Sequence, residues 1–286
     1  MKANIFLVSI LAIGGLLVSC LPQEADPDTT AALPVKNLIN LAYGTHPRQV
    51  VDLYLPANRH ENTPTLILVH GGGWMEGDKS DMNPFRDFIR DQLPYLAVAN
   101  LNYRLADAAN SPYPMQLDDI QALVAHLNEH REEYRLGPRL GFIGVSAGGH
   151  LSLLWSYTRD TEGSVQLVCS VVGPTDLLDE SYRTASDPSL RKMLDLFGEG
   201  EELLMAASPR QQVTSDAPPT LLFYGGQDPL VPNSQGMGLR DRLSELGVPH
   251  EFHFYPNEGH GWLGLNLVDS LIKLKSFVEK RLPEEE

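Results

Sequence analysis

The chain has 286 residues, of which 42% are hydrophobic and 21% charged, so it fits one large α/β domain or two small ones and slightly favours one. Its 22 lysines and arginines against 37 aspartates and glutamates give a formal net charge of −15. Binding to nucleic acid requires a basic face, and binding to anionic lipid through charge requires a polybasic patch. No segment supplies either, and two cysteines are too few for a disulfide scaffold.

The N-terminus has the pattern of a bacterial secretion signal. Lys2 supplies a positive charge, and the stretch from Ile5 to Val18 carries none. A membrane-spanning helix needs about 20 apolar residues, whereas the apolar region of a signal peptide has about 7–15. We therefore interpret residues 1–19 as a signal peptide.

The signal is followed by a cysteine in a distinctive setting. Residues 17–20 read Leu-Val-Ser-Cys and resemble the bacterial lipobox, in which an apolar residue and two small or aliphatic ones precede a lipidated cysteine. The alternative is an ordinary cleavage site beside a bystander cysteine, but position and neighbours favour lipidation of Cys20. Residues 20–34 would then be the lipidated cysteine and a solvated, proline-containing tether. We expect a lipid-anchored protein of the bacterial cell envelope, at the outer membrane or cell surface rather than in the cytoplasm.

Apolar segments and helical patterns alternate through residues 35–286, which we predict to form one catalytic domain. Predicted strands lie at 50–55, 65–69, 95–101, 140–145, 167–172, 220–225 and 250–255, and predicted helices run from Pro114 through Leu127, from 147 through Trp155, near 233–247 and near 265–281. This rhythm predicts an α/β fold with a mostly parallel central sheet covered by helices on both faces. Cys169, inside one apolar strand, is expected to be a structural residue.

One segment departs from this rhythm. Residues 176–217 show some helical pattern but no convincing strand. An insertion that follows the carboxyl end of a strand lies over the ligand crevice in a sheet of this kind. We therefore predict a small lid at 176–217.

A serine follows the strand at 140–145 directly. Ser146 stands in the sequence Gly-Val-Ser-Ala-Gly-Gly, and its neighbours 144 and 147–149 are small. A nucleophilic serine in a sharp turn between strand and helix needs small neighbours, because the two elements pack closely there. A glycine-rich loop with an incidental serine is the alternative. The strand–turn–helix context favours the nucleophile.

A second glycine-rich segment, His70-Gly-Gly-Gly-Trp74, follows the buried strand at 65–69. Consecutive glycines allow several backbone N–H groups to point at one anion, such as the oxyanion of an ester's tetrahedral intermediate. A tight loop without ligand is one alternative. A phosphate-binding loop is another, but Asp78 would place a carboxylate against the phosphates, and we reject it.

A serine nucleophile needs a base and an acid that orients the base. Asp228 follows the strand at 220–225, and His260 lies in the loop after the strand at 250–255. Both are expected on the rim of the sheet that carries Ser146. Asp176 competes as the acid, whereas His250 and His253 compete less well as the base because they lie within a predicted strand.

These segments together resemble an α/β-hydrolase of the hormone-sensitive-lipase-like and feruloyl or acetyl-xylan-esterase-like (BD-FAE-like) group. The matching segments are the HGGGW loop at 70–74, 102–104 (NYR), 144–150 (GVSAGGH), 225–228 (GGQD) and 259–261 (GHG), within a match over roughly 40–280.

The resemblance implies roles for individual residues. Ser146 would be the nucleophile, Asp228 the orienting acid and His260 the base. The backbone N–H groups of Gly71, Gly72 and Ala147 would form the oxyanion hole; we also expect Trp74 to line the substrate pocket.

The chain departs from the lipase-like branch of this group. Val145 stands where many relatives carry Asp or Glu, and there is no room for a large N-terminal helical cap. The resemblance therefore implies a serine esterase for short acyl esters, O-acetyl or feruloyl groups of carbohydrates, without metal or organic cofactor. A formamidase-type amide hydrolase and a non-catalytic envelope binding module are the alternatives. The sequence leaves the oligomeric state open.

Overall fold

A computed structural model describes residues 33–184, 188–198 and 200–285. The predicted signal peptide and Cys20 therefore lie outside the described residues, as does all of the predicted tether except Leu33 and Pro34. The carbonyls of these two residues already accept hydrogen bonds from the domain, from Asn58 N at 2.9 Å and Arg59 Nη1 at 2.6 Å.

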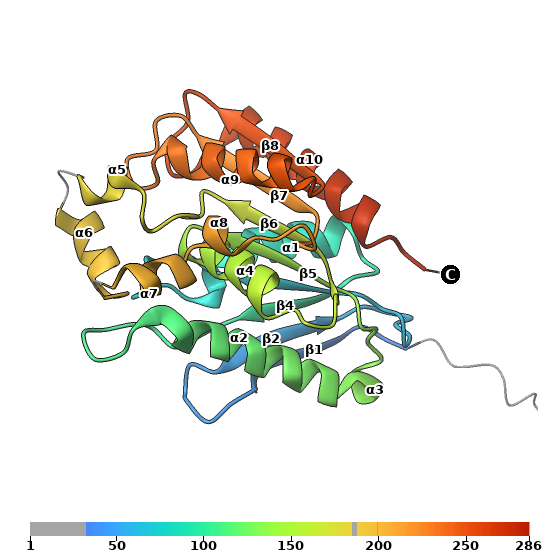
Figure 1. Cartoon of the computed structure of the whole chain (residues 1–286). Coiled ribbons are helices and arrows are strands. Elements are labelled where there is room, and N and C mark those ends of the chain that lie inside the picture. Colours follow the sequence, from blue (N-terminus) through green and yellow to red (C-terminus); the bar gives the residue numbers. More distant parts are fainter. Residues whose placement is uncertain (1–32, 185–187, 199, 286) are drawn as a thin grey trace, which may run out of the picture. The chain divides into compact units, whose positions relative to one another are not determined.

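The core of the domain is an eight-stranded sheet (Figure 1) in the order β1-β2-β4-β3-β5-β6-β7-β8. The strands are β1 Lys36–Ala42, β2 Val50–Leu55, β3 Thr65–Val69, β4 Ala97–Leu101, β5 Leu140–Val145, β6 Val165–Val171, β7 Thr220–Gly225 and β8 His250–Tyr255. The six neighbouring strands β4, β3, β5, β6, β7 and β8 pair in parallel. β1 pairs antiparallel with β2, and β2 antiparallel with β4, at one edge of the sheet. The predicted fold class, a mostly parallel sheet, is confirmed.

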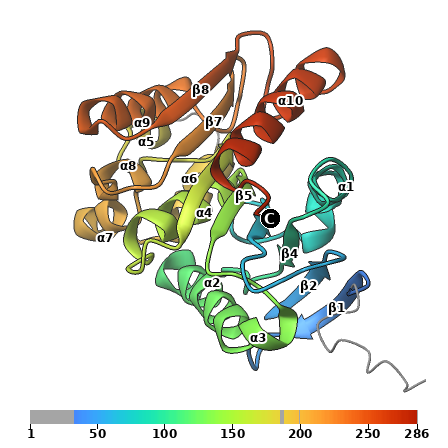
Figure 2. The ribbon, with the colours of Figure 1, turned by 90° about the vertical axis from the view of Figure 1, so that its right-hand side faces the viewer.

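Helices cover both faces of this sheet, as Figure 2 shows. The larger helices are α1 Asn83–Gln92, α2 Pro112–Glu129, α4 Ala147–Thr158, α9 Asn233–Leu246 and α10 Gly264–Arg281. Apolar side chains of α2, α4 and α9 pack on one face, and those of α1 and α10 on the other. Two short elements, η1 Lys79–Met82 and α3 Arg131–Tyr134, complete this part of the domain.

Some elements of the fold, among them β1, η1 and α1, were not predicted from the sequence. β1 is an edge strand whose side chains are mostly exposed, so it lacks the apolar run of the inner strands. Helix α1 and η1 follow the glycine-rich loop, where turn residues dominate the local pattern. Cys169 is fully buried in β6, as expected, and burial raises the pKa of its thiol.

The segment after β6 at 176–217 is called the insertion. Its described part contains four short helices: α5 Glu180–Arg183, α6 Pro188–Asp195, α7 Glu201–Ala206 and α8 Pro209–Gln212. It lies at the carboxyl ends of the parallel strands (Figure 1). None of the helices described in the domain combines the length and the apolar character of a membrane-crossing segment.

Candidate active site

Ser146 occupies a sharp turn between β5 and α4. Its backbone has φ 55° and ψ −122°, and its N–H donates to Val171 O at 2.8 Å. A positive φ is uncommon for a residue with a side chain, and such conformations are concentrated at functional sites. A Cβ added at Gly144 would lie 2.1 Å from Gly148 O, so this turn admits no larger residue there. The small neighbours of Ser146 thus serve the close packing that the sequence indicated.

Three side chains from separate elements form a hydrogen-bonded chain at the rim of the sheet. Ser146 Oγ lies 2.9 Å from His260 Nε2, and His260 Nδ1 lies 2.8 Å from Asp228 Oδ2. Because a carboxylate only accepts, Nδ1–H of the neutral imidazole donates to Asp228, and Nε2 accepts from the serine hydroxyl. The structure therefore brings Ser146, His260 and Asp228 together in the order that a serine nucleophile requires.

The Asp228 carboxylate is fixed by the loop that carries it. Its side chain is fully buried, and Oδ1 accepts the backbone N–H groups of Leu230 at 2.8 Å and Val231 at 2.9 Å. These bonds compensate the burial of a charge and leave Oδ2 directed at His260. The orientation of the imidazole is thereby determined by backbone geometry.

The glycine-rich loop approaches Ser146 from β3. A Cβ on Gly71 would lie 3.2 Å from the Cβ of Ser146, and Gly72 has φ 107°. Gly71, Gly72 and Ala147 line the same cavity as Ser146. The N–H groups of Gly72 and Ala147 donate to no protein acceptor within the described part of the chain. Two backbone donors near the nucleophile are thus available to a ligand.

Side chains from several elements hold this loop. His70 is buried and stacks on Tyr103 with ring centroids 4.2 Å apart, and Tyr103 Oη donates to His70 O at 2.8 Å. Arg48 Nη2 donates to Gly77 O at 2.9 Å and lies 3.2 Å from His70 Nε2. Burial lowers the pKa of His70 to about 4, which keeps the ring neutral beside the guanidinium. His70 thus supports the loop.

Trp74 and His150 connect the loop to the rest of the site. Trp74 lines the cavity, but its exposed fraction is only 3%. Its Nε1–H donates to His150 Nδ1 at 3.2 Å, and its ring packs edge-on against Phe197 of the insertion. His150 Nε2–H in turn donates to Ala207 O at 2.7 Å, and burial lowers the pKa of His150 to about 4. Trp74 therefore forms part of the cavity wall and also anchors the insertion.

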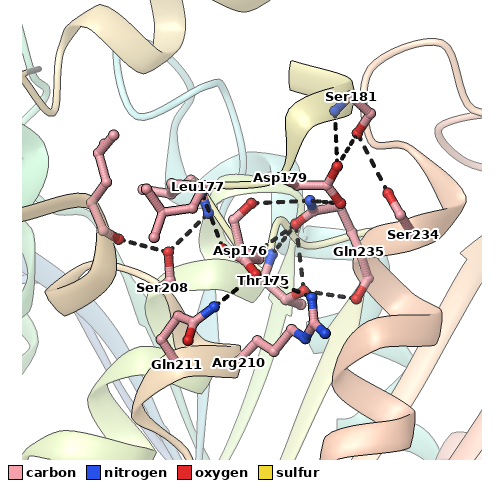
Figure 3. Close-up of polar contacts among 12 residues, drawn as sticks. Thr175, Asp176, Leu177, Asp179, Ser181, Ser208, Arg210, Gln211, Ser234 and Gln235 are labelled. Carbon is pink, nitrogen blue, oxygen red and sulfur yellow. Dashed lines mark hydrogen bonds and ion pairs between the residues drawn. The ribbon is translucent and has the colours of Figure 1, made fainter. Parts of the chain in front are cut away.

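Asp176, the competing acid, contacts neither His260 nor Ser146 by a hydrogen bond. Figure 3 shows its carboxylate at the base of the insertion, where Oδ2 accepts from Gln211 Nε2 at 2.9 Å and from Arg210 Nη1 at 3.2 Å. The fully buried Gln235 accepts the backbone N–H of Asp176 at 2.8 Å. We call this network of Thr175, Asp176, Leu177, Asp179, Ser208, Arg210, Gln211 and Gln235 the insertion clamp (Figure 3).

A cavity of about 530 Å³ opens above Ser146 and His260. The glycine-rich loop and η1 form one side, and the insertion contributes Tyr182, Leu190, Met193 and Leu194 to the other. A Cβ on Gly73 would lie 2.7 Å from Met193 Sδ, so the insertion contacts the loop directly. The segment that departs from the strand–helix rhythm thus supplies part of the cavity wall.

Sequence reasoning missed several of these cavity residues. Glu76, Asp81 and Phe85 line the cavity and lie shortly after the glycine motif in sequence, but outside it. The four insertion residues belong to no motif. A carboxylate or leucine becomes a wall residue only through folding, so proximity in sequence to the motif was the one available signal. Within the described residues, no three His, Cys, Asp or Glu side chains gather in a way that could hold a metal ion.

The fold and this site define an α/β-hydrolase of the carboxylesterase type. The profile of the BD-FAE family matches residues 51–243, more than half of the chain, and the chain belongs to that family. It is 26% identical to "Esterase LipC" of Mycobacterium tuberculosis, over 89% of this chain and 69% of that protein. It spans about half the length of some further relatives.

Solved structures show the same fold. A truncated carbohydrate esterase from gut microbiota is 21% identical, with a TM-score of 0.73 over 87% of this chain and 97% of that one. An acetyl ester-xyloside bifunctional hydrolase from Caldicellulosiruptor lactoaceticus is 22% identical, with a TM-score of 0.67 over 81% and 88%. The predicted class of protein, a hydrolase of carboxylic esters, is confirmed by the family and its esterase relatives.

Proposed function

We propose that the chain hydrolyses short acyl esters of carbohydrate alcohols through an acyl-enzyme on Ser146. The observation that supports this most is the Ser146–His260–Asp228 chain, with contacts of 2.9 and 2.8 Å, at the edge of a cavity. A hydroxyl beside a neutral imidazole can attack a carbonyl carbon, because the imidazole takes its proton as the new bond forms.

The reaction then follows from the contacts. Ser146 Oγ bonds to the acyl carbon while its proton moves to His260 Nε2, and Asp228 stabilises the resulting imidazolium. The carbonyl oxygen becomes an oxyanion that the N–H groups of Gly71, Gly72 and Ala147 would stabilise. His260 gives its proton to the leaving alcohol, and the C–O bond breaks. Water then attacks the acyl-enzyme with the same base, releasing the carboxylic acid.

The cavity above Ser146 is lined mostly by apolar side chains, and Glu76 and Asp81 give it a polar part. Carboxylates accept hydrogen bonds from hydroxyl groups, so this part suits a polar alcohol. The same charges, within a net charge of −15, disfavour anionic esters. Two structural neighbours, a carbohydrate esterase and an acetyl ester-xyloside hydrolase, have names that agree with this substrate class. The oligosaccharide ester is thus our proposed substrate.

Location is a separate part of the proposal. A lipid on Cys20 would hold the enzyme in the cell envelope, where it would meet glycan esters outside the cytoplasm. Metabolic labelling with a fatty-acid analogue tests this, because Cys20→Ser should lose the label. Equal labelling of mutant and parent would refute the anchor and leave the esterase proposal unaffected.

The mechanism is tested by an organophosphonate, which reacts with a nucleophilic serine. Mass spectrometry of the treated full-length protein should find one adduct, on Ser146, and the Ser146→Ala variant should take up none. The Ser146→Ala variant should also lose the hydrolysis of acetylated xylo-oligosaccharides. An adduct on another residue, or full hydrolysis by Ser146→Ala, would refute the proposal.

A further inference from the structure

Trp74 ends the glycine-rich loop in a backbone conformation that few residues with a side chain adopt. Its φ is 63°, and Gly72 and Gly73 before it also have positive φ values, 107° and 55°. Glycine takes up such values freely, so the two glycines give this stretch little conformational preference of their own. For a residue with a side chain the left-handed region costs free energy, and it persists where surrounding contacts hold it. The contacts of Trp74 therefore determine how the loop is oriented.

The backbone carbonyl of Trp74 is held from outside the loop. It accepts the backbone N–H of Ala106 at 2.8 Å and an Nε2–H of Gln116 at 2.8 Å. Two residues earlier, the carbonyl of Gly72 accepts the backbone N–H groups of residues 75 and 76 at 3.1 and 3.0 Å. This turn is thus closed by its own backbone and is tied to the rest of the domain through the Trp74 carbonyl.

Gln116 is a fully buried residue of α2 whose side chain acts only as a donor. The two N–H bonds of its amide go to Trp74 O and, also at 2.8 Å, to Arg104 O. Its Oε1 is buried and has no partner in the described part of the chain. A buried unpaired acceptor is unfavourable, and an apolar side chain of the same shape would avoid it. What this amide contributes therefore lies in the two bonds that it donates.

The second carbonyl that Gln116 holds belongs to a well-fixed part of the fold. Asp119 is fully buried on α2 and accepts the backbone N–H of Arg104 at 2.7 Å and its Nε–H at 2.8 Å. Residues three positions apart lie on the same face of a helix, so Gln116 and Asp119 contact Arg104 together. A short chain of hydrogen bonds thus connects Trp74 to α2.

We propose that Gln116 is a positioning residue for the oxyanion hole, an inference that rests on the proposed function. Gln116 does not line the cavity above Ser146. It acts through Trp74, whose carbonyl fixes the turn that carries the free N–H group of Gly72. Donors stabilise an oxyanion best when they point at its position before the reaction begins. Release of the Trp74 carbonyl would let the turn reorient, and the transition state would lose part of its stabilisation.

The variant Gln116→Met tests this, because methionine has a similar length and no N–H to donate. Gln116→Glu is the second variant, since a carboxyl group donates at most one hydrogen bond and cannot hold both carbonyls. The matched control is Gln166→Met. Gln166 Nε2 also donates to two backbone carbonyls, Gly163 O at 3.2 Å and Ser164 O at 3.3 Å, but it lies at the start of β6, at the end of the sheet opposite Ser146.

The readouts are kcat and KM of the full chain for p-nitrophenyl acetate. Gln116→Met should lower kcat about 10- to 100-fold, which is part of the roughly 10²- to 10³-fold loss that follows removal of one oxyanion-hole donor. KM should change less than about threefold, because the oxyanion forms only in the transition state. Gln116→Glu should shift kcat in the same direction, and Gln166→Met should match the parent.

Two results would overturn the proposal. One is a kcat within about threefold of the parent in both Gln116 variants, because Gln116 would then serve the fold alone. The other is a raised KM with unchanged kcat, since Gln116 would then shape the substrate cavity and not the oxyanion hole. Absence of hydrolysis in the parent, or its survival in Ser146→Ala, would instead refute the proposed function itself, so the two failures are distinguishable.

Discussion

Asp176 and Asp228 follow neighbouring parallel strands, β6 and β7, and both carboxylates are almost completely buried. Their partners differ. Asp228 receives two backbone N–H groups on one oxygen and His260 on the other, whereas Asp176 receives Arg210 and Gln211 from the far end of the insertion. One carboxylate orients the imidazole of His260, and the other belongs to the insertion clamp. Burial after a strand end is thus common to both aspartates, and only their hydrogen-bond partners distinguish them.

His260 and His150 also differ in their hydrogen-bond partners. His260 bridges Ser146 and Asp228 with a nitrogen on each side. His150 has the same two nitrogens engaged by Trp74 and Ala207, so it links the glycine-rich loop to the insertion. The same residue type thus links Ser146 to Asp228 at one place and holds the cavity wall in position at the other.

The largest expected effect concerns the nucleophile and the base. Ser146→Ala and His260→Ala should each lower kcat by about 10⁴-fold or more, because proton transfer and attack act as one unit. The double variant should be little worse than either single variant, which a kinetic double-mutant cycle measures. Multiplicative losses would show that the two side chains act independently.

Asparagine substitutions test directly whether the two aspartates have different roles. Asp228→Asn should lower kcat by about 10³- to 10⁴-fold, because the amide favours the wrong imidazole tautomer. Asp176→Asn should change kcat less than about threefold. Both variants are compared with the parent in steady-state ester hydrolysis. A severe loss in Asp176→Asn alone would make Asp176 the orienting acid.

Gln235 tests the clamp by stability. Its Oε1 accepts the N–H groups of Thr175 and Asp176, and its side chain is fully buried. Gln235→Ala leaves both donors unpaired and should lower the free energy of unfolding by about 3 kcal/mol. Chemical denaturation measures this, with the exposed neighbour Ser234→Ala expected within about 0.5 kcal/mol of the parent. Equal stability of the two variants would contradict the clamp.

A further effect is a dependence of stability on pH. Burial holds the pKa values of His70 and His150 at about 4 in the folded chain, against about 6.5 in an unfolded one. Between pH 6.5 and 4 the unfolded state binds these protons and the folded state does not, so stability falls as the pH falls. Each histidine should contribute on the order of 1 kcal/mol per pH unit.

The variant His150→Gln tests this prediction, because it removes one of the two buried histidines that take up a proton on unfolding. Denaturation curves between pH 4 and 8 should show a shallower slope for the variant than for the parent. The same slope in both proteins would mean that His150 takes up its proton without opening the contact to Trp74.

Sequence patterns over a few neighbouring residues were sufficient to predict much of the fold. Apolar runs identified the inner strands β2 to β7, because buried strands are apolar on both faces, and the glycines around Ser146 identified the strand–helix turn. The edge strand β1 gave no such signal, since an edge strand with exposed side chains has no apolar run.

The sequence by itself determined the fold class and named Ser146, Asp228 and His260 as residues to bring together, since each follows a predicted strand in an ordered motif. Only the tertiary structure decided between Asp176 and Asp228. Both follow a strand of the same sheet, and the choice depends on contacts with residues 32 and 34 positions away, to His260 and Arg210. The cavity walls were decided in the same way. Such distant contacts leave no periodic trace, because they depend on how elements pack and not on how each one forms.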